Sequence, residues 1–478
     1  MKNRSYWILA ILMISGLVQA RPIFEGDFEE LDIEPLFPQV NGIFQLPNGP
    51  ATNQLDWVLQ QLAQDDTSLG EINTHFDASW LSQITAEQTR DFIQSVRTDY
   101  PDAVVVDVLE VTPVSVNVII QGQNASAFRA FLSLQARYSQ GQKIVSFGVN
   151  FYAGTLQYPE DQNLTLTQAA DKFATLAADT GLLIAYIDEN NQCQPILNRD
   201  ATTLRATGSI FKAWVLGGLA EAIDDNTLSL AQSVTLVDSE RVFGGSLINR
   251  EPNGTVFPLQ DLGILMMGVS DNTATDLVHE TVGRVLIDNY IGNSGVNEID
   301  VLRPILSVNE QFHLFFSFDQ STALQYVNGS ESFQQQFIQN SIVPLGPVSS
   351  FPFNNEALLT DGSWQASPLD ICANMASLRQ YEKASEARIM VDTAYGSQTA
   401  QSELRNHWDR VWYKGGSLVS AGAGYHVLTH GWLLEDNGRP PFVVVGMTNN
   451  NNGGIDANDG IFRVQSVLAR LLELTAEL

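Results

Sequence analysis

The sequence Gly208-Ser209-Ile210-Phe211-Lys212 opens a segment of helical periodicity over 208–223. Three residues are nearly one helical turn, so Ser209 and Lys212 share a face. A serine hydroxyl needs a neighbouring base to become a nucleophile, and a lysine can be that base when burial destabilises its ammonium form. The stretch therefore predicts an activated serine at the start of a helix.

Ser-x-x-Lys alone is a weak signal, because a helix-start serine near an exposed lysine has the same pattern. Two more motifs follow it in the chain. Ser270-Asp271-Asn272 opens a helical segment, for which a plain N-cap is the alternative. Lys414-Gly415-Gly416-Ser417 lies on a strand-like stretch, for which a glycine bulge is the alternative. The three motifs stand in the order of a Ser/Lys acyl-transfer site, and they contain two of the six lysines.

On these motifs, residues about 165–478 resemble the class A β-lactamase and penicillin-binding superfamily. The layout of the whole chain resembles the serine hydrolases of the clavulanic-acid-biosynthesis type, which place a small cystatin- or isomerase-like α+β domain first. The resemblance implies a β-lactamase-like antiparallel sheet with helical layers, preceded by that small domain.

The resemblance also implies roles for the motif residues. Ser209 matches the acylated serine, and Lys212 matches the lysine that accepts its proton. Ser270 matches the serine that relays a proton to the leaving nitrogen, and Asn272 the asparagine that binds the substrate amide. Lys414 matches the strand lysine that steadies Ser270 and the substrate carboxylate. Gly416 and Ser417 would lie along the substrate, with the backbone N–H groups of Ser209 and Ser417 forming the oxyanion hole.

Two departures from the family pattern bear on function. Gly415 stands where the family has a hydroxyl residue, which places ordinary β-lactam affinity in doubt. The deacylating glutamate of class A enzymes should fall near Leu306-Ser307, and no Glu-x-x-Leu-Asn pattern occurs there. The acids in that region are Glu298, Asp300 and Glu310, and none of them is assigned the role.

The beginning of the chain reads as an export signal and a tether. Residues 1–20 have a basic start, an apolar run and a small-residue cleavage site after Ala20, with an uncleaved anchor as the alternative. We expect a periplasmic or secreted protein with no membrane span in the mature chain. Residues 21–50 are acidic and interrupted by prolines, and they predict a linker.

The rest of the chain divides by pattern into two domains. Residues 51–154 predict a small accessory α+β domain, with helices over 52–66 and 79–97 and strands over 103–111, 115–121, 127–138 and 143–152. Residues 165–478 predict the catalytic domain, with strands over 182–188, 194–198, 408–419, 425–435 and 442–448 and helices between and after them. Strands at both ends of a helical region suit one sheet with a helical layer behind it.

The composition and the cysteine spacing argue against some partners and cofactors. The net charge of −29 disfavours a nucleic-acid partner. Cys193 and Cys372 are interpreted as separate thiols, although export permits a disulfide. No Cys/His spacing suits zinc, and we expect no metal and no cofactor. The oligomeric state is open.

Three hypotheses follow. The first is an exported serine hydrolase that acts on amides or esters, β-lactams or cell-wall-derived molecules among them. The second is a penicillin-binding or sensing protein that is acylated at Ser209 with little turnover. The third gives the main role to residues 51–154 as a binding domain, although no catalytic group is recognised there.

Overall fold

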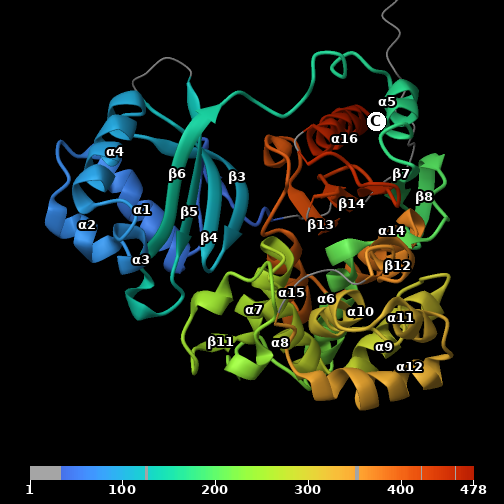
Figure 1. The fold of residues 1–478 in the computed structure, drawn as a ribbon. Helices are drawn as coiled ribbons and strands as arrows, with labels where there is room; N and C mark the ends of the chain where they lie inside the picture. The colour runs from blue at the N-terminus through green and yellow to red at the C-terminus, as the bar shows by residue number, and fades with distance from the viewer. Residues whose placement is uncertain (1–33, 124–127, 350–354, 421, 458) are drawn as a thin grey trace, which may run out of the picture.

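The computed structural model describes residues 34–123, 128–349, 355–420, 422–457 and 459–478. Two antiparallel sheets with separate hydrophobic cores organise these residues (Figure 1). We call residues 50–152 the N-terminal unit and residues 166–476 the C-terminal unit. The export signal expected over 1–20 lies outside the described residues. Within the described part of the chain, no helix has the length and apolar content needed to cross a membrane.

The N-terminal unit is a four-stranded sheet covered by helices. Its strands lie in the order β3 (Val104–Thr112), β4 (Ser115–Gln121), β5 (Arg129–Ala136) and β6 (Ile144–Tyr152). Its helices are α1 (Pro50–Ala63), α2 (Leu69–His75), α3 (Ala78–Leu81) and α4 (Ala86–Asp99). Every second residue of β5 is buried, because one face of the sheet packs on the helices. The helix expected over 79–97 is divided, because Thr85 caps a new helix by accepting from Gln88 N.

Part of the segment that was expected to be a linker is folded. Residues 39–44 form a small hairpin of β1 (Gln39–Val40) and β2 (Ile43–Phe44). Phe37 and Phe44 are buried in the hydrophobic core of the N-terminal unit. The burial of these two aromatic side chains outweighs the acidic, proline-rich character of the segment. Residues 21–33 lie outside the described part.

The C-terminal unit is built on a five-stranded antiparallel sheet. Its order is β13 (Arg410–Ser420), β14 (Gly424–Glu435), β15 (Phe442–Asn449), β7 (Asp179–Ile187) and β8 (Cys193–Arg199). Alternate residues of β15 enter different cores, since Val443 packs toward the central helices and Val444 toward α5 (Leu166–Phe173) and α16 (Gly460–Ala476). The sheet is therefore buried on both faces, and the predicted antiparallel sheet between helical layers is confirmed.

Ten helices of the described chain lie between β8 and β13. They are α6 (Lys212–Asp224), α7 (Leu259–Gly268), α8 (Asn272–Val282), α9 (Arg284–Asn293), α10 (Val308–Phe316), α11 (Gln320–Val327), α12 (Glu331–Phe337), α13 (Leu358–Asp361), α14 (Pro368–Leu378) and α15 (Glu386–Tyr395). Short strands pair among them: β9 (Arg205–Ala206) with β12 (Gln365–Ala366), and β10 (Ser233–Thr235) with β11 (Val256–Pro258). Helix α6 is the central one and is apolar on all sides. A Cβ at Gly217 would lie 1.9 Å from the Tyr290 ring, so glycine lets α9 approach the α6 backbone closely.

Cys193 and Cys372 form a disulfide, which corrects the expectation of separate thiols. Cys193 begins β8 and Cys372 lies on α14, and their Cα atoms are 6.3 Å apart. The expectation was wrong because α14 packs against β7 and β8, an approach that the spacing of two cysteines does not reveal.

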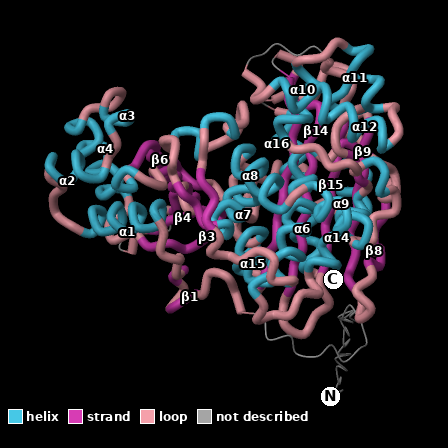
Figure 2. The backbone as a smooth tube through the Cα atoms, turned by 90° about the horizontal axis from the view of Figure 1, so that it is seen from below, coloured by secondary structure: helices cyan, strands magenta, loops and turns pink. Residues whose placement is uncertain are grey.

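The two units are joined by backbone hydrogen bonds along β3. Val111 N donates to Ser397 O at 2.8 Å, and Thr399 N donates to Leu109 O at 2.9 Å. Glu110 and Gln398 form a β-bridge between these bonds. Figure 2 shows β3 beside α7 and α8 of the C-terminal unit. The edge of the N-terminal sheet is thus attached beside the helices that carry the candidate site.

Candidate active site

Ser209 lies on a tight 3-10 turn, Gly208–Phe211, that leads directly into α6. The turn is pressed against β13. Gly208 has φ 52°, and a Cβ there would lie 2.6 Å from Ser417 N. A Cβ at Gly416 would lie 2.0 Å from Thr207 O and 2.9 Å from Ser209 N. Both glycines are needed because the helix start and the strand are in backbone contact.

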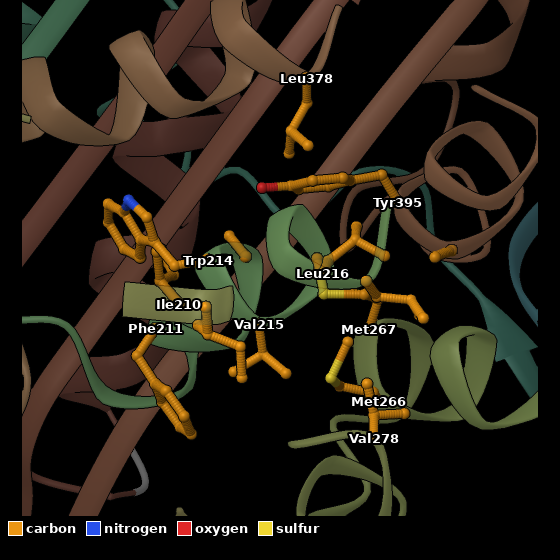
Figure 3. Close-up of a cluster of buried hydrophobic side chains, with 14 of the residues drawn as sticks. Ile210, Phe211, Trp214, Val215, Leu216, Met266, Met267, Val278, Leu378 and Tyr395 are labelled. Atoms are coloured by element: carbon orange, nitrogen blue, oxygen red, sulfur yellow. The ribbon is translucent and has the colours of Figure 1, made fainter. Parts of the chain in front are cut away.

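The residues around Ser209 are held by a dense hydrophobic core. Ile210, Phe211 and Trp214 are buried, and Phe211 stacks on Trp364 with ring centroids 3.8 Å apart. Figure 3 shows Ile210, Phe211 and Trp214 at the left and Met266 and Met267 of α7 at the right of the same cluster. The packing of these three buried side chains therefore fixes the position of Ser209 at the start of α6.

Lys212 is fully buried and joins the first motif to the second. Its Nζ donates to Ser270 O at 2.6 Å, to Asn272 Oδ1 at 2.8 Å and to Ser270 Oγ at 3.2 Å. Burial lowers the pKa of Lys212 to about 7, although the carboxyl groups of Asp271 and Asp276 oppose that shift. A lysine with this pKa is partly neutral at neutral pH and can accept a proton.

The middle residue of the second motif, Asp271, fixes the conformation of that motif. Ser270 has φ 56°, and Asp271 is buried below it. The Asp271 carboxyl accepts from Leu247 N at 2.6 Å, from Ile248 N at 3.1 Å and from Ala274 N at 2.9 Å. It therefore caps α8 and fixes the neighbouring loop, and Ser270 and Asn272 remain directed at Lys212.

Lys414 joins the third motif to the same hydroxyl. Its Nζ donates to Ser270 Oγ at 3.0 Å and to Gly415 O at 2.6 Å. Burial, and then the neighbouring Lys212, lower the pKa of Lys414 well below its ordinary value. The structure thus brings together Lys212, Ser270, Asn272 and Lys414, and it places Ser209 on the turn that leads into Lys212.

The glycine at position 415, which departs from the family motif, has a steric explanation. A Cβ at Gly415 would lie 2.3 Å from the Tyr413 hydroxyl, which points along the same face of β13. That hydroxyl also bonds to His430 Nδ1 at 2.8 Å. A hydroxyl residue at position 415 would therefore collide with Tyr413.

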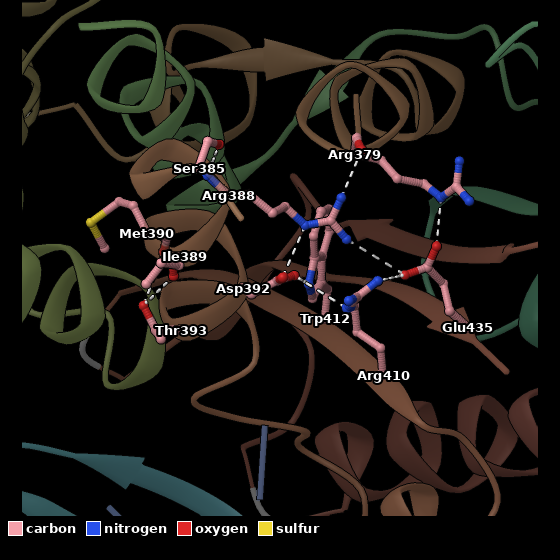
Figure 4. A network of polar contacts seen from close by, with 10 residues as sticks. All are labelled: Arg379, Ser385, Arg388, Ile389, Met390, Asp392, Thr393, Arg410, Trp412 and Glu435. Atoms are coloured by element: carbon pink, nitrogen blue, oxygen red, sulfur yellow. Dashed lines mark hydrogen bonds and ion pairs between the residues drawn. The ribbon is translucent and has the colours of Figure 1, made fainter. Parts of the chain in front are cut away.

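A buried ion-pair network anchors the beginning of β13. Glu435 of β14 accepts from Arg379, the residue after α14, and from Arg410 of β13, and Arg388 of α15 lies 3.9 Å from it. Asp392 accepts from Trp412 Nε1 at 2.9 Å (Figure 4). Burial raises the pKa of Glu435, but the guanidinium groups of Arg410 and Arg379 outweigh it and lower that pKa overall. The network ties the strand that carries Lys414 to two helices.

Two acids near the expected deacylating position, Glu310 and Asp276, form their hydrogen bonds at the start of α10. Glu310 forms an ion pair with Arg284 at 2.6 Å and caps α10 through Ser307 N at 2.8 Å. Asp276 also faces α10, because its carboxyl accepts from Val308 N at 2.7 Å and Asn309 N at 2.9 Å. Burial raises the pKa of Asp276 to about 7. Among the described residues, no group of three or more His, Cys, Asp or Glu side chains is arranged to hold a metal ion.

Residues of the N-terminal unit were missed by the sequence analysis. Glu110, Ser115, Asn117 and Gln135 line a cavity together with Ser270 and Lys414. The sequence analysis recognised no catalytic group in 51–154 and placed none of its residues beside the candidate site. No local pattern could show this, because an acid on an alternating strand resembles a solvent-facing residue.

Comparison with known families agrees with this geometry. Residues 166–336 match the model described as Beta-lactamase enzyme family, and residues 46–135 match the one described as ORF 12 gene product N-terminal. In its fold, the C-terminal unit is similar to the serine β-lactamase and penicillin-binding superfamily. None of the curated proteins matches the chain.

Several solved structures are similar to the C-terminal unit at low identity. A beta-lactamase from Chitinophaga pinensis DSM 2588 is 15% identical with a TM-score of 0.44, and the match covers 65% of this chain and 97% of that one. A beta-lactamase from Francisella tularensis is 12% identical with a TM-score of 0.43, covering 65% and 100%. PBP-A is 15% identical with a TM-score of 0.41, covering 64% and 97%.

Proposed function

We propose that this protein is a serine hydrolase that cleaves amides or esters through an acyl-serine at Ser209. One observation carries the proposal: Lys212 and Lys414 both donate to the hydroxyl of Ser270, and burial lowers the pKa of both lysines. This is the arrangement that a proton relay between nucleophile and leaving group requires.

The reaction assigns each group one role. Neutral Lys212 accepts the Ser209 proton as Ser209 Oγ attacks the carbonyl carbon. The backbone N–H groups of Ser209 and Ser417 stabilise the oxyanion. The bond to the leaving atom then breaks, and that atom receives a proton through Ser270, which is resupplied by the lysine ammonium groups. Water attacks the acyl-serine, so the net reaction converts one ester or amide and one water into an acid and an alcohol or amine.

The direct test is hydrolysis of a chromogenic cephalosporin and a simple aryl ester by the wild type and by Ser209→Ala. We expect hydrolysis by the wild type and a loss of roughly 10³-fold or more in kcat/KM in the variant, which keeps the oxyanion hole but has no nucleophile. Exposed Ser239→Ala is the matched control. Equal rates for wild type and Ser209→Ala would refute hydrolysis by this site.

A second candidate is a protein that is acylated but turns over slowly. It is favoured by the engagement of Glu310 with Arg284 and Ser307, which occupies the carboxyl oxygens of this acid. Intact-mass measurement after exposure to penicillin separates the two. A lasting adduct supports the acylated sensor, and a rapid return to the unmodified mass supports the hydrolase.

We further propose that the protein acts outside the cytoplasm, in the periplasm or after secretion. The signal-like residues 1–20 suggest export, and the Cys193–Cys372 disulfide suits an oxidising compartment. Detection of a mature chain that begins at Arg21 would support this location, and a reduced, uncleaved protein in the cytoplasm would contradict it.

A further inference from the structure

A cavity of about 520 Å³ lies between the two units, beside the hydrogen-bonded lysines. Ser270 and Lys414 line it from the C-terminal unit, and Glu110 and Asn117 line it from the N-terminal unit. Ser209 is not part of its lining. We propose that this cavity is a leaving-group subsite, in which Glu110 accepts N–H bonds from an amine or ammonium carried by the leaving group. The inference rests on the proposed function, because the cavity opens beside the hydroxyl that would protonate the leaving atom.

Glu110 is an acid without a complete set of partners. Its side chain is only 6% exposed, and its Oε1 has no hydrogen-bond partner among the described residues. Burial raises the pKa of Glu110, while hydrogen bonds from Ser115 and Asn117 lower it in part. A buried acceptor that lacks a donor is unfavourable. The free oxygen is therefore best satisfied by a donor that enters the cavity.

Asn117 supplies a second acceptor at the same place. It is the cross-strand partner of Glu110 in the pairing of β3 with β4, and its Oδ1 also lacks a partner among the described residues. Glu110 is the one carboxyl residue in the described lining of this cavity. Two adjacent free acceptors, one of them ionisable, favour a ligand group with several N–H bonds and a positive charge.

The subsite is held in place by the contact between the units. Glu110 lies between the hydrogen bonds Val111 N to Ser397 O and Thr399 N to Leu109 O. Farther along, Arg250 Nη1 donates to Gln135 Oε1 at 3.1 Å. Backbone hydrogen bonds on both sides of Glu110 therefore fix its position, as a binding group requires.

The proposal gives a specific order of preference among leaving groups. A leaving group with an aminomethyl substituent should bind better than the same group with a methyl substituent, because only the first can satisfy Glu110. A Glu110 that serves only to join the two units would give no such preference, so ligand selectivity separates the two roles.

Binding to the full-length protein tests this without catalysis. The probes are 4-(aminomethyl)phenol and 4-methylphenol, measured by calorimetry on the wild type, Glu110→Gln and Glu87→Gln. Glu87 is exposed on α4 of the same unit and controls for net charge. We expect the wild type and E87Q to prefer the amine and the preference to fall roughly ten- to hundredfold in E110Q, as for the loss of a hydrogen bond to a charged group. No preference in the wild type, or an undiminished preference in E110Q, would overturn the proposal.

Should circular dichroism show E110Q unfolded, Asn117→Leu is measured in its place. The same fall in preference is expected, and an undiminished preference would again overturn the proposal.

Hydrolysis of the two matching acetate esters separates this proposal from the general one. If Ser209→Ala abolishes hydrolysis but E110Q keeps the wild-type ratio of kcat/KM for the two esters, the subsite is wrong and the hydrolase stands. If neither ester is cleaved but the binding preference depends on Glu110, the amine-binding role of Glu110 stands, and its assignment to a leaving group falls with the hydrolase.

Discussion

Lys212 and Lys414 donate to one oxygen, with Nζ atoms 3.2 Å and 3.0 Å from Ser270 Oγ. Both lysines are buried, so keeping both charged at this separation is unfavourable. Burial lowers the pKa of Lys212 to about 7 and lowers the pKa of Lys414 well below its ordinary value, so Lys212 is partly neutral at neutral pH. A base and a proton donor can therefore exist side by side around Ser270.

The first prediction concerns pH. Because the pKa of Lys212 is lowered to about 7 and only its neutral form accepts the Ser209 proton, acylation should rise as pH increases through about 7 and then level off. The measurement is the rate of acyl-enzyme formation from pH 5 to 9 by stopped flow. A rate independent of pH over this range would remove Lys212 as the base.

The second prediction concerns stability at the same residue. The folded pKa of about 7 lies below the ordinary 10.5, so between these values the unfolded chain binds more protons than the folded one. The charge of Lys212 therefore costs stability that is recovered as pH rises from about 7 toward 10.5. Lys212→Met should be inactive yet raise the free energy of unfolding at pH 7 by about 0.5–2 kcal/mol, the usual range for a stabilising substitution, because a buried ammonium group is removed. Urea denaturation of both proteins at pH 7 measures the change, and a less stable variant would show that the ammonium is well compensated.

The third prediction concerns Gly415. Because the Tyr413 hydroxyl occupies the space of a side chain at 415, Gly415→Thr should destabilise the protein by about 1–3 kcal/mol through overpacking. The double variant Tyr413→Phe/Gly415→Thr should recover part of that loss. Thermal unfolding of the two single variants and the double variant gives the coupling, and strict additivity would show that Tyr413 is not the obstacle.

The fourth prediction concerns the disulfide. Cys193 and Cys372 are 179 residues apart in sequence, so their bond restricts a large part of the unfolded chain. Replacing both by Ala should lower the free energy of unfolding by about 2–5 kcal/mol. Reductant should destabilise the wild type and leave the double variant unchanged, and a wild type that titrates with two free thiols after denaturation without reductant would contradict the bond.

Much of this architecture follows from local patterns in the chain. The apolar runs of β13, β14 and β15 indicate strands, and the motif residues from Ser209 to Lys414 are recognisable by type and order. The disulfide and the role of Glu110 do not follow, because each depends on two segments that meet only in the folded protein. The collision between Tyr413 and position 415 likewise depends on side-chain placement, which a glycine in a motif does not reveal.

If Ser209 is the nucleophile and neutral Lys212 is its base, a serine-directed probe should label Ser209 at a rate that depends on Lys212. The measurement is intact-mass analysis and peptide mapping after treatment with a fluorophosphonate serine probe and, in parallel, with penicillin. We expect one adduct on Ser209 in the wild type, none at this position in Ser209→Ala, and labelling slowed by roughly 10²–10⁴-fold in Lys212→Met. An adduct on another residue, or labelling of Ser209 at the wild-type rate in Lys212→Met, would contradict these roles.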